Sequence, residues 1–162
     1  MIKTILLAAA ATVAVSGAAS AQVLTEKNIS SSLAVEIAQG AVQACAADKY
    51  NVTAAVVDRA GVLRALVRAD NAGTHSVAAA QDKAFTSASS RTPTSKMAEN
   101  VQKNPGAAGL VDIKGFLVLA GGVPIKAGDA VIGAIGVGGA PGGNFDEACA
   151  VKAIEAVADK LK

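Results

Sequence analysis

The stretch that decides the fold is residues 113–139, IKGFLVLAGGVPIKAGDAVIGAIGVGG. It contains three short runs of mainly apolar residues, and the turns between them contain glycine. Runs of this length, bounded by glycine, are typical of β-strands. We therefore predict three strands, at residues 116–120, 123–126 and 131–137.

Two further strands are predicted upstream, at residues 52–58 and 62–68. They flank the sequence DRAG, in which Gly61 can adopt a positive φ angle, and together they indicate a β-hairpin. Successive side chains in a strand point to opposite faces. We therefore expect Arg64 and Arg68 to share one face of the second strand.

Four helical segments surround these strands. In residues 25–48, apolar residues recur every fourth position, and Thr25 or Asn28 is a possible N-cap. Residues 74–90 read as a helix capped by Thr74, and a shorter helix begins at Pro93 and Thr94 and ends before NPGAAG. A closing amphipathic helix is predicted at residues 145–161. This order of elements favours an α+β domain with an antiparallel sheet.

The first 21 residues are typical of a secretory signal. Lys3 is followed by a short apolar run and by Ala19-Ser20-Ala21, a cleavage site of the A-x-A type. The run is too short and too rich in alanine to favour a transmembrane anchor, and no later segment is long enough to span a bilayer. We therefore expect an exported protein, periplasmic or extracellular, with residues 22–162 forming one domain and no membrane association after cleavage.

The composition argues against nucleic acid as a partner. The chain has 15 basic and 13 acidic residues, a formal charge of +2, and no tryptophan. A nearly neutral surface with few aromatic side chains offers neither the basic patch nor the stacking platform that nucleic-acid binding requires.

Cys45 and Cys149 are the two cysteines, and their spacing matches no metal motif. Cys45 lies on the apolar stripe of its helix and should face inward, whereas Cys149 lies at the flank of the last helix. A disulfide between these helices and a pair of buried free thiols are both compatible with the spacing.

His75 is the only histidine, and it lies where the second helix is predicted to begin, in RADNAGTHSVAAAQDKAF. Imidazole is the commonest metal ligand among the side chains available here, so His75 is the main candidate for a haem iron, ahead of Met97, Tyr50 and the cysteines. The alternative interpretation is a partly exposed polar residue without a ligand. A bis-histidine haem would require two subunits.

Three cations are candidates for pairing with the propionates of haem: Arg64, Arg68 and Lys83. No G-x-S-x-G motif accompanies His75, and one histidine with two distant cysteines does not make a zinc site. We therefore predict no catalytic residues, and His75 is the only predicted metal ligand.

Gly133 and Gly136 lie inside the last predicted strand, on opposite faces. Glycine within a strand indicates a close backbone neighbour, which is a packed helix, a flat ligand or another subunit, with the helix favoured for each. A phosphate-binding loop is not predicted, because GAIGVGG lacks the strand–GxGxxG–helix arrangement.

Several motifs, in this order, resemble the GlcG/HbpS family of haem-binding-like proteins: AVVDRAGVLRALVRAD, DKAFTSASSRTPTS, AGGVPIKAGDAVIGAIGVGGAPGG and DEACA. The resemblance covers the chain from about residue 25 onward. It is greatest to the exported branch, in which a Gly-x-His loop, here Gly73-Thr74-His75, leads into the next helix. The chain departs from the family pattern at Gly138, where serine is frequent, and at Thr74, where proline is frequent.

The resemblance implies a profilin-like α+β fold with a five-stranded antiparallel sheet, and self-association into a homo-oligomer. It also implies haem as the cofactor, for haem handling or redox sensing. We therefore predict an exported, non-enzymatic haem-binding protein with a site formed by His75, Arg64, Arg68, Lys83, Gly133 and Gly136. The alternatives are an accessory protein or enzyme that acts on a small carboxylate metabolite, and an oligomeric interaction module without haem.

Overall fold

A computed structural model describes residues 21–162, so the predicted signal segment lies outside the described part of the chain, apart from Ala21. The elements, in order, are α1 (Ser31–Ala47), β1 (Thr53–Asp58), β2 (Leu63–Arg68), α2 (Ser76–Ser90), α3 (Thr94–Lys103), the 3-10 helix η1 (Pro105–Asp112), β3 (Gly122–Ala127), β4 (Ala130–Gly138), α4 (Gly143–Glu155) and the 3-10 helix η2 (Ala158–Leu161). This confirms the prediction of an α+β fold.

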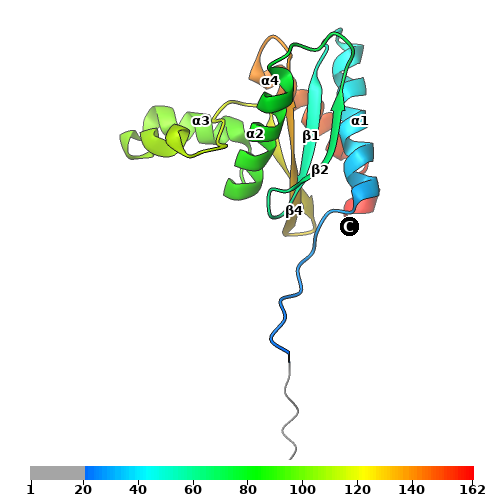
Figure 1. The fold of residues 1–162 in the computed structure, drawn as a ribbon, viewed down its shortest axis with the longest axis vertical. Coiled ribbons are helices and arrows are strands. Elements are labelled where there is room, and N and C mark those ends of the chain that lie inside the picture. The colour runs from blue at the N-terminus through cyan, green and yellow to red at the C-terminus, as the bar shows by residue number, and fades with distance from the viewer. Residues whose placement is uncertain (1–20) are drawn as a thin grey trace, which may run out of the picture.

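The sheet is antiparallel, with its strands in the order β2-β1-β4-β3. Helices α1 and α4 pack together on one face, whereas α2 lies against β1 and β4 on the other, and α3 projects away from the body (Figure 1). The main core lies between the sheet and the α1–α4 pair, and it is built from small and medium apolar side chains such as Ile37, Val56 and Ile135. No helix in residues 21–162 is long and apolar enough to cross a membrane.

The described sheet has four strands rather than five, because the predicted strand at residues 116–120 is a loop. Its backbone groups bond to helices instead of to a neighbouring strand. Leu117 N–H donates to Thr86 Oγ1 at 2.8 Å, and Thr94 Oγ1 donates to Leu119 O at 2.7 Å. Phe116 packs edge-on against Phe85 of α2. Phe116 and the backbone of this run are therefore bound to α2 and α3 and not to a strand of the sheet.

The predicted hairpin is present as β1 and β2, but its two arginines do not share a face. A β-bulge shifts the register between Val56, paired with Ala65, and Val57, paired with Leu63, so Arg64 lies at the irregularity. A bulge interrupts the alternation of side chains. Arg64 consequently reaches the start of α1, where it donates to Ser31 Oγ at 2.8 Å.

Both predicted N-caps of the first two helices are wrong. Helix α1 begins at Ser31, and Ser30 caps it by accepting a hydrogen bond from Leu33 N–H at 3.3 Å. Asn28 instead accepts from the N–H groups of Ile29 and Arg59, which anchors the hairpin turn. Helix α2 begins at Ser76, so its N-cap position belongs to His75 rather than to Thr74.

The closing helix is shorter than predicted, since α4 ends at Glu155 and a separate 3-10 turn follows at residues 158–161. Cys45 of α1 and Cys149 of α4 form a disulfide, with Cα atoms 5.4 Å apart. Both cysteines are buried, so Cys149 lies inside the α1–α4 contact and not at its flank. Of the two predicted alternatives, the structure therefore supports the disulfide.

Candidate functional site

His75 is exposed at the entrance of α2. The imidazole folds back over Gly73, where an added Cβ would lie 2.7 Å from His75 Cε1. The loop below it is fixed by Ser76, whose hydroxyl donates to Gly73 O at 2.6 Å and hydrogen-bonds Thr53 Oγ1 of β1 at 2.8 Å. The ring therefore has a fixed backbone attachment but a solvent-facing side chain.

A cavity of about 250 Å³ opens beside this imidazole. Its walls are His75 and Ala79 on one side, the loop at residues 138–143 on the other, and Leu119 at the rim. Lys83 and Asp146 also line it, and both are almost completely buried, at 2% of their full exposure. The cavity thus brings one exposed and two buried titratable groups together.

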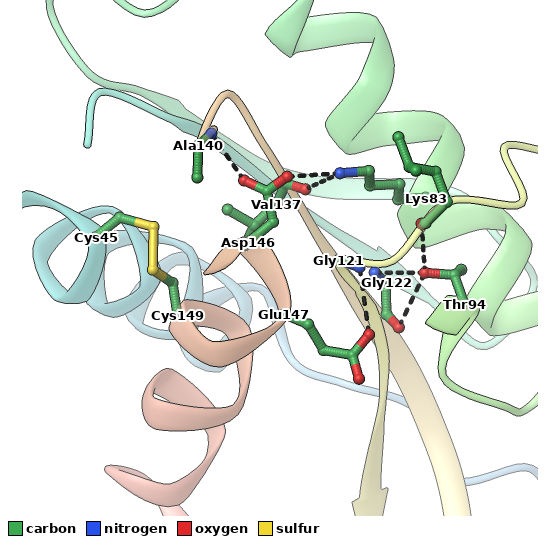
Figure 2. Close-up of polar contacts among 11 residues, drawn as sticks. Cys45, Lys83, Thr94, Gly121, Gly122, Val137, Ala140, Asp146, Glu147 and Cys149 are labelled. Carbon is green, nitrogen blue, oxygen red and sulfur yellow. Dashed lines mark hydrogen bonds and ion pairs between the residues drawn. A yellow bond between two sulfur atoms is a disulfide. The ribbon is translucent and has the colours of Figure 1, made fainter. Parts of the chain in front are cut away.

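Lys83 and Asp146 form a buried ion pair that joins α2 to α4 (Figure 2). Lys83 Nζ lies 2.7 Å from Asp146 Oδ2 and donates a second hydrogen bond to Val137 O at 2.9 Å. The other carboxylate oxygen of Asp146 accepts from Ala140 N–H at 3.0 Å. The pair therefore fixes the end of β4, the following loop and the start of α4 relative to α2.

Burial raises the pKa of Asp146 above its ordinary value, because the carboxylate is removed from water. The hydrogen bond and charge of Lys83 oppose this change, followed by the Ala140 N–H and the nearby His75. Of these partners, Lys83 contributes most of the stabilisation of the ionised form.

The two predicted arginines lie in different places. Arg68 donates to Ala72 O, in the loop that leads to His75, so it belongs to the surroundings of the candidate site. Arg64 is bonded to Ser31 and lies 3.8 Å from the carboxylate of Asp58. Neither arginine lines the cavity beside His75.

The two predicted glycines lie under other elements, and neither lines this cavity. A Cβ on Gly136 would lie 2.1 Å from Ala80 O and 2.5 Å from Ala84 N, so the backbone of α2 rests directly on this residue. A Cβ on Gly133 would lie 2.4 Å from Val57 O. The close neighbours of both glycines are therefore parts of this chain itself, with the favoured packed helix found at Gly136.

The sequence analysis missed Asp146 and the loop at residues 139–143. A signal for Asp146 was available in α2, where Ala80, Lys83, Ala84 and Ser87 form one stripe at helical spacing. A lysine on a buried stripe requires an acidic partner, because an unpaired charge is very costly to bury. The stripe thus predicts a partner, although the pattern does not say which acid supplies it.

A larger cavity of about 400 Å³ lies beside the middle of α2, lined by Val57, Gly61, Leu63, Phe85 and Gly115 among others. Its lining is mainly apolar and includes no histidine. In the described residues no group of three or more His, Cys, Asp or Glu side chains could hold a metal ion. The cysteines are joined in the disulfide, Met97 is buried and Tyr50 is partly buried against the main core, so His75 is the most accessible of the candidate iron ligands in the described residues.

Known proteins include a family and solved structures that resemble this chain in sequence and fold. The family model described as "Haem degrading protein HbpS-like" matches residues 29–155. The crystal structure of a double mutant of HbpS from Streptomyces reticuli is 38% identical, with a TM-score of 0.79, and the match covers 92% of this chain and 98% of that one. A second crystal structure of HbpS is 37% identical, with a TM-score of 0.80, over 87% of this chain and 98% of that one.

More distant structures share the architecture. ORFY of Klebsiella pneumoniae is 24% identical with a TM-score of 0.80, over 86% of this chain and 97% of that one. The structure of a PduOC–haem complex is 23% identical with a TM-score of 0.71, over 80% and 94%. No match was found among the curated proteins. The long match to the family model and the HbpS structures, over almost all of the described fold, establish that this chain belongs to the HbpS-like family.

Proposed function

We propose that this protein binds haem at the entrance of α2, with His75 as the iron ligand or as a polar contact above the ring. The observation that carries the proposal is an exposed imidazole at the mouth of a cavity that also contains a lysine. Family membership supports haem as the ligand, because the description of the family model names haem. Haem would supply an iron centre, and His75 would be the residue of this chain that offers it a nitrogen ligand.

The residues present fit a haem that lies across the cavity mouth. The cavity, at about 250 Å³, is below the roughly 300–1,000 Å³ typical of small-molecule pockets, so it does not enclose a porphyrin. The exposed imidazole of His75 and the half-exposed side chain of Leu119 instead offer a ligating and an apolar contact at the rim. A second subunit would cover the outer face of such a haem.

Propionate groups would find two cations near His75. Arg68 is attached to the loop before the histidine, and Lys83 forms part of the cavity wall. We propose these two as the propionate contacts and give Arg64 a lesser part, since its guanidinium is directed to Ser31 and Asp58.

We propose binding, rather than a chemical reaction on a substrate, as the activity of this site. Its two buried titratable groups are bonded to each other, which leaves His75 as the accessible one. Export to an oxidising compartment is proposed from the signal-like residues 1–21, and the Cys45–Cys149 disulfide supports it.

We also propose that the protein forms a homo-oligomer. Large apolar side chains are exposed at the β1–β2 turn and the start of β2, and between η1 and β3, namely Val62, Leu63, Val111, Ile113 and Leu119. Several exposed apolar residues on neighbouring elements favour an interface. Analytical ultracentrifugation of the purified protein, with and without haemin, measures this association, and a monomer in both states would contradict it.

The test of haem binding is titration of the purified protein with haemin, followed by the Soret band. A saturable shift is expected for the wild type, and His75→Ala should change the band position and weaken binding at least tenfold. Because His75 is exposed and makes no capping bond, this variant is expected to fold. A wild-type band that does not shift, or an identical titration in His75→Ala, would remove His75 from the site.

A matched set of arginine variants tests the propionate contacts. Arg68→Met should weaken haemin binding by about three- to tenfold, corresponding to roughly 0.7–1.4 kcal/mol. Arg59→Met is the control, because Arg59 pairs with Glu26 beside the hairpin turn. Equal affinities in these two variants would exclude Arg68.

A further inference from the structure

We infer that the cavity behind His75 is a binding site for a small free carboxylate, independent of haem. The inference rests on a surplus of hydrogen-bond donors among the groups that line this cavity. The inference shares His75 and Lys83 with the proposed haem site, but it concerns a different ligand that binds in the absence of haem.

The first surplus hydrogen-bond donor belongs to Lys83. A lysine ammonium has three N–H donors, and two of them are used by Val137 O and Asp146 Oδ2. In the described part of the chain, Lys83 Nζ makes no third hydrogen bond. A buried donor without an acceptor is unfavourable, so a ligand oxygen that reaches Lys83 would be stabilised by a charge-assisted bond.

Asp146 accepts a hydrogen bond from a group of this chain at each of its two oxygens. Oδ2 accepts from Lys83 and Oδ1 from Ala140 N–H. The Asp146 carboxylate therefore neutralises part of the charge of Lys83. Because it only accepts hydrogen bonds, it offers no donor to a ligand.

His75 adds a second donor to the lining of the cavity. Gly142 and Gly143 line the cavity as well, and they are the N-cap and the first residue of α4, a helix without a side-chain cap. A carboxylate has two oxygens that both accept, and so it can bond to Lys83 with one and to His75 or the loop with the other. The volume of about 250 Å³ restricts the ligand to a small acid.

The shared chemistry is a carboxylate, which is supplied either by a free acid or by a haem propionate. The two sources predict different results. A free acid binds to the protein alone, whereas a site that serves only propionates responds to haemin and not to small acids. If both bind, acetate should also weaken haemin binding by competition.

The single histidine makes a direct measurement possible, because His75 gives one Hε1 resonance in the NMR spectrum of this chain. Titration of the purified protein with sodium acetate should move this resonance along a saturable curve. Acetamide, which has the same size without the charge, and sodium chloride at equal ionic strength are the controls. A response to acetate that is absent or linear, or that is equalled by acetamide or chloride, would overturn the inference.

The lysine is tested in a variant that is expected to fold. Lys83→Met alone leaves the carboxylate of Asp146 buried without its cation, so Lys83→Met with Asp146→Asn is used instead. This double variant should bind acetate at least tenfold more weakly, while Arg59→Met should bind it as the wild type does. Unchanged acetate affinity in the double variant would exclude Lys83. Haemin titrations of the same samples are separate readouts, so failure of the carboxylate site and failure of the haem site are distinguishable.

Discussion

Lys83 Nζ and Asp146 Oδ2 are 2.7 Å apart, and both side chains are excluded from water. The two residues are far apart in the sequence, and their ion pair ties α2 to α4. Removing one partner of such a pair leaves an uncompensated buried charge, whereas removing both does not.

We therefore expect Lys83→Met to lower the free energy of unfolding by about 3–5 kcal/mol, and the addition of Asp146→Asn to recover most of that loss. Urea denaturation of the four proteins, analysed as a double-mutant cycle, measures the coupling. Additive losses in the double variant would show that the two residues contribute independently.

The titration of Asp146 has a predictable effect on stability. Its folded pKa is raised above the ordinary value of 3.8 by burial, so between these two pKa values the folded protein retains a proton that the unfolded chain has released. The contribution of Asp146 to the free energy of unfolding is therefore fully present below pH 3.8 and falls as the pH rises through the folded pKa.

Wild type and the Lys83→Met/Asp146→Asn variant differ in this titration, so their difference in unfolding free energy isolates it. We expect this difference to move against the wild type as the pH is raised from 3.8. The ¹³C chemical shift of the Asp146 carboxyl group gives the folded pKa directly. A carboxyl that titrates below 3.8 would reverse the expected sign.

The disulfide between Cys45 and Cys149 closes a long loop, since the cysteines are 104 positions apart. Cross-linking across a loop of this length restricts the unfolded chain, and its loss typically costs about 2–5 kcal/mol. We expect Cys45→Ala with Cys149→Ala to unfold at a lower urea concentration than the oxidised wild type. Dithiothreitol should destabilise the wild type but not the variant, and equal midpoints for all samples would contradict the prediction.

Gly136 is expected to be the most restrictive of the glycines beneath α2. An added Cβ would lie 2.1 Å from Ala80 O and 2.5 Å from Ala84 N, and these are backbone atoms that cannot rotate away. Gly136→Ala should therefore destabilise the protein by about 3 kcal/mol or more. Gly109→Ala is the control, because no atom lies within 4 Å of its added Cβ. Thermal unfolding of both variants measures the difference, and a normal melting temperature for Gly136→Ala would contradict the observed packing.

Much of the fold follows from local patterns. The hairpin, the last two strands and the helices at residues 76–90 and 94–103 were predicted to within a few residues. The first helix was also predicted, although it begins at Ser31 and not near residue 25. The prediction of a strand at residues 116–120 was wrong, because an apolar run does not reveal whether it will pack against a strand or a helix. Here the partners are Phe85, Thr86 and Thr94, which are distant in the sequence.

The candidate site was predictable only in part. His75 stood out as the single histidine, and Lys83 as a candidate cation, but the strand alternation that grouped Arg64 with Arg68 was interrupted by a bulge. Asp146 was missed because pairing between α2 and α4 depends on tertiary structure. The roles of Gly133 and Gly136 depended likewise on which element covers each face of β4.

The contact between Gly136 and α2 has a consequence for any attempt to reshape this protein. Main-chain atoms meet there on both sides, so the height of α2 above the sheet is set without the help of side chains. His75 directly precedes α2, so the same contact also sets the position of His75 relative to the sheet. To enlarge the cavity for a bulkier ligand, the loop at residues 138–143 should therefore be lengthened or shortened, because moving α2 away from the sheet would break its backbone contact with Gly136.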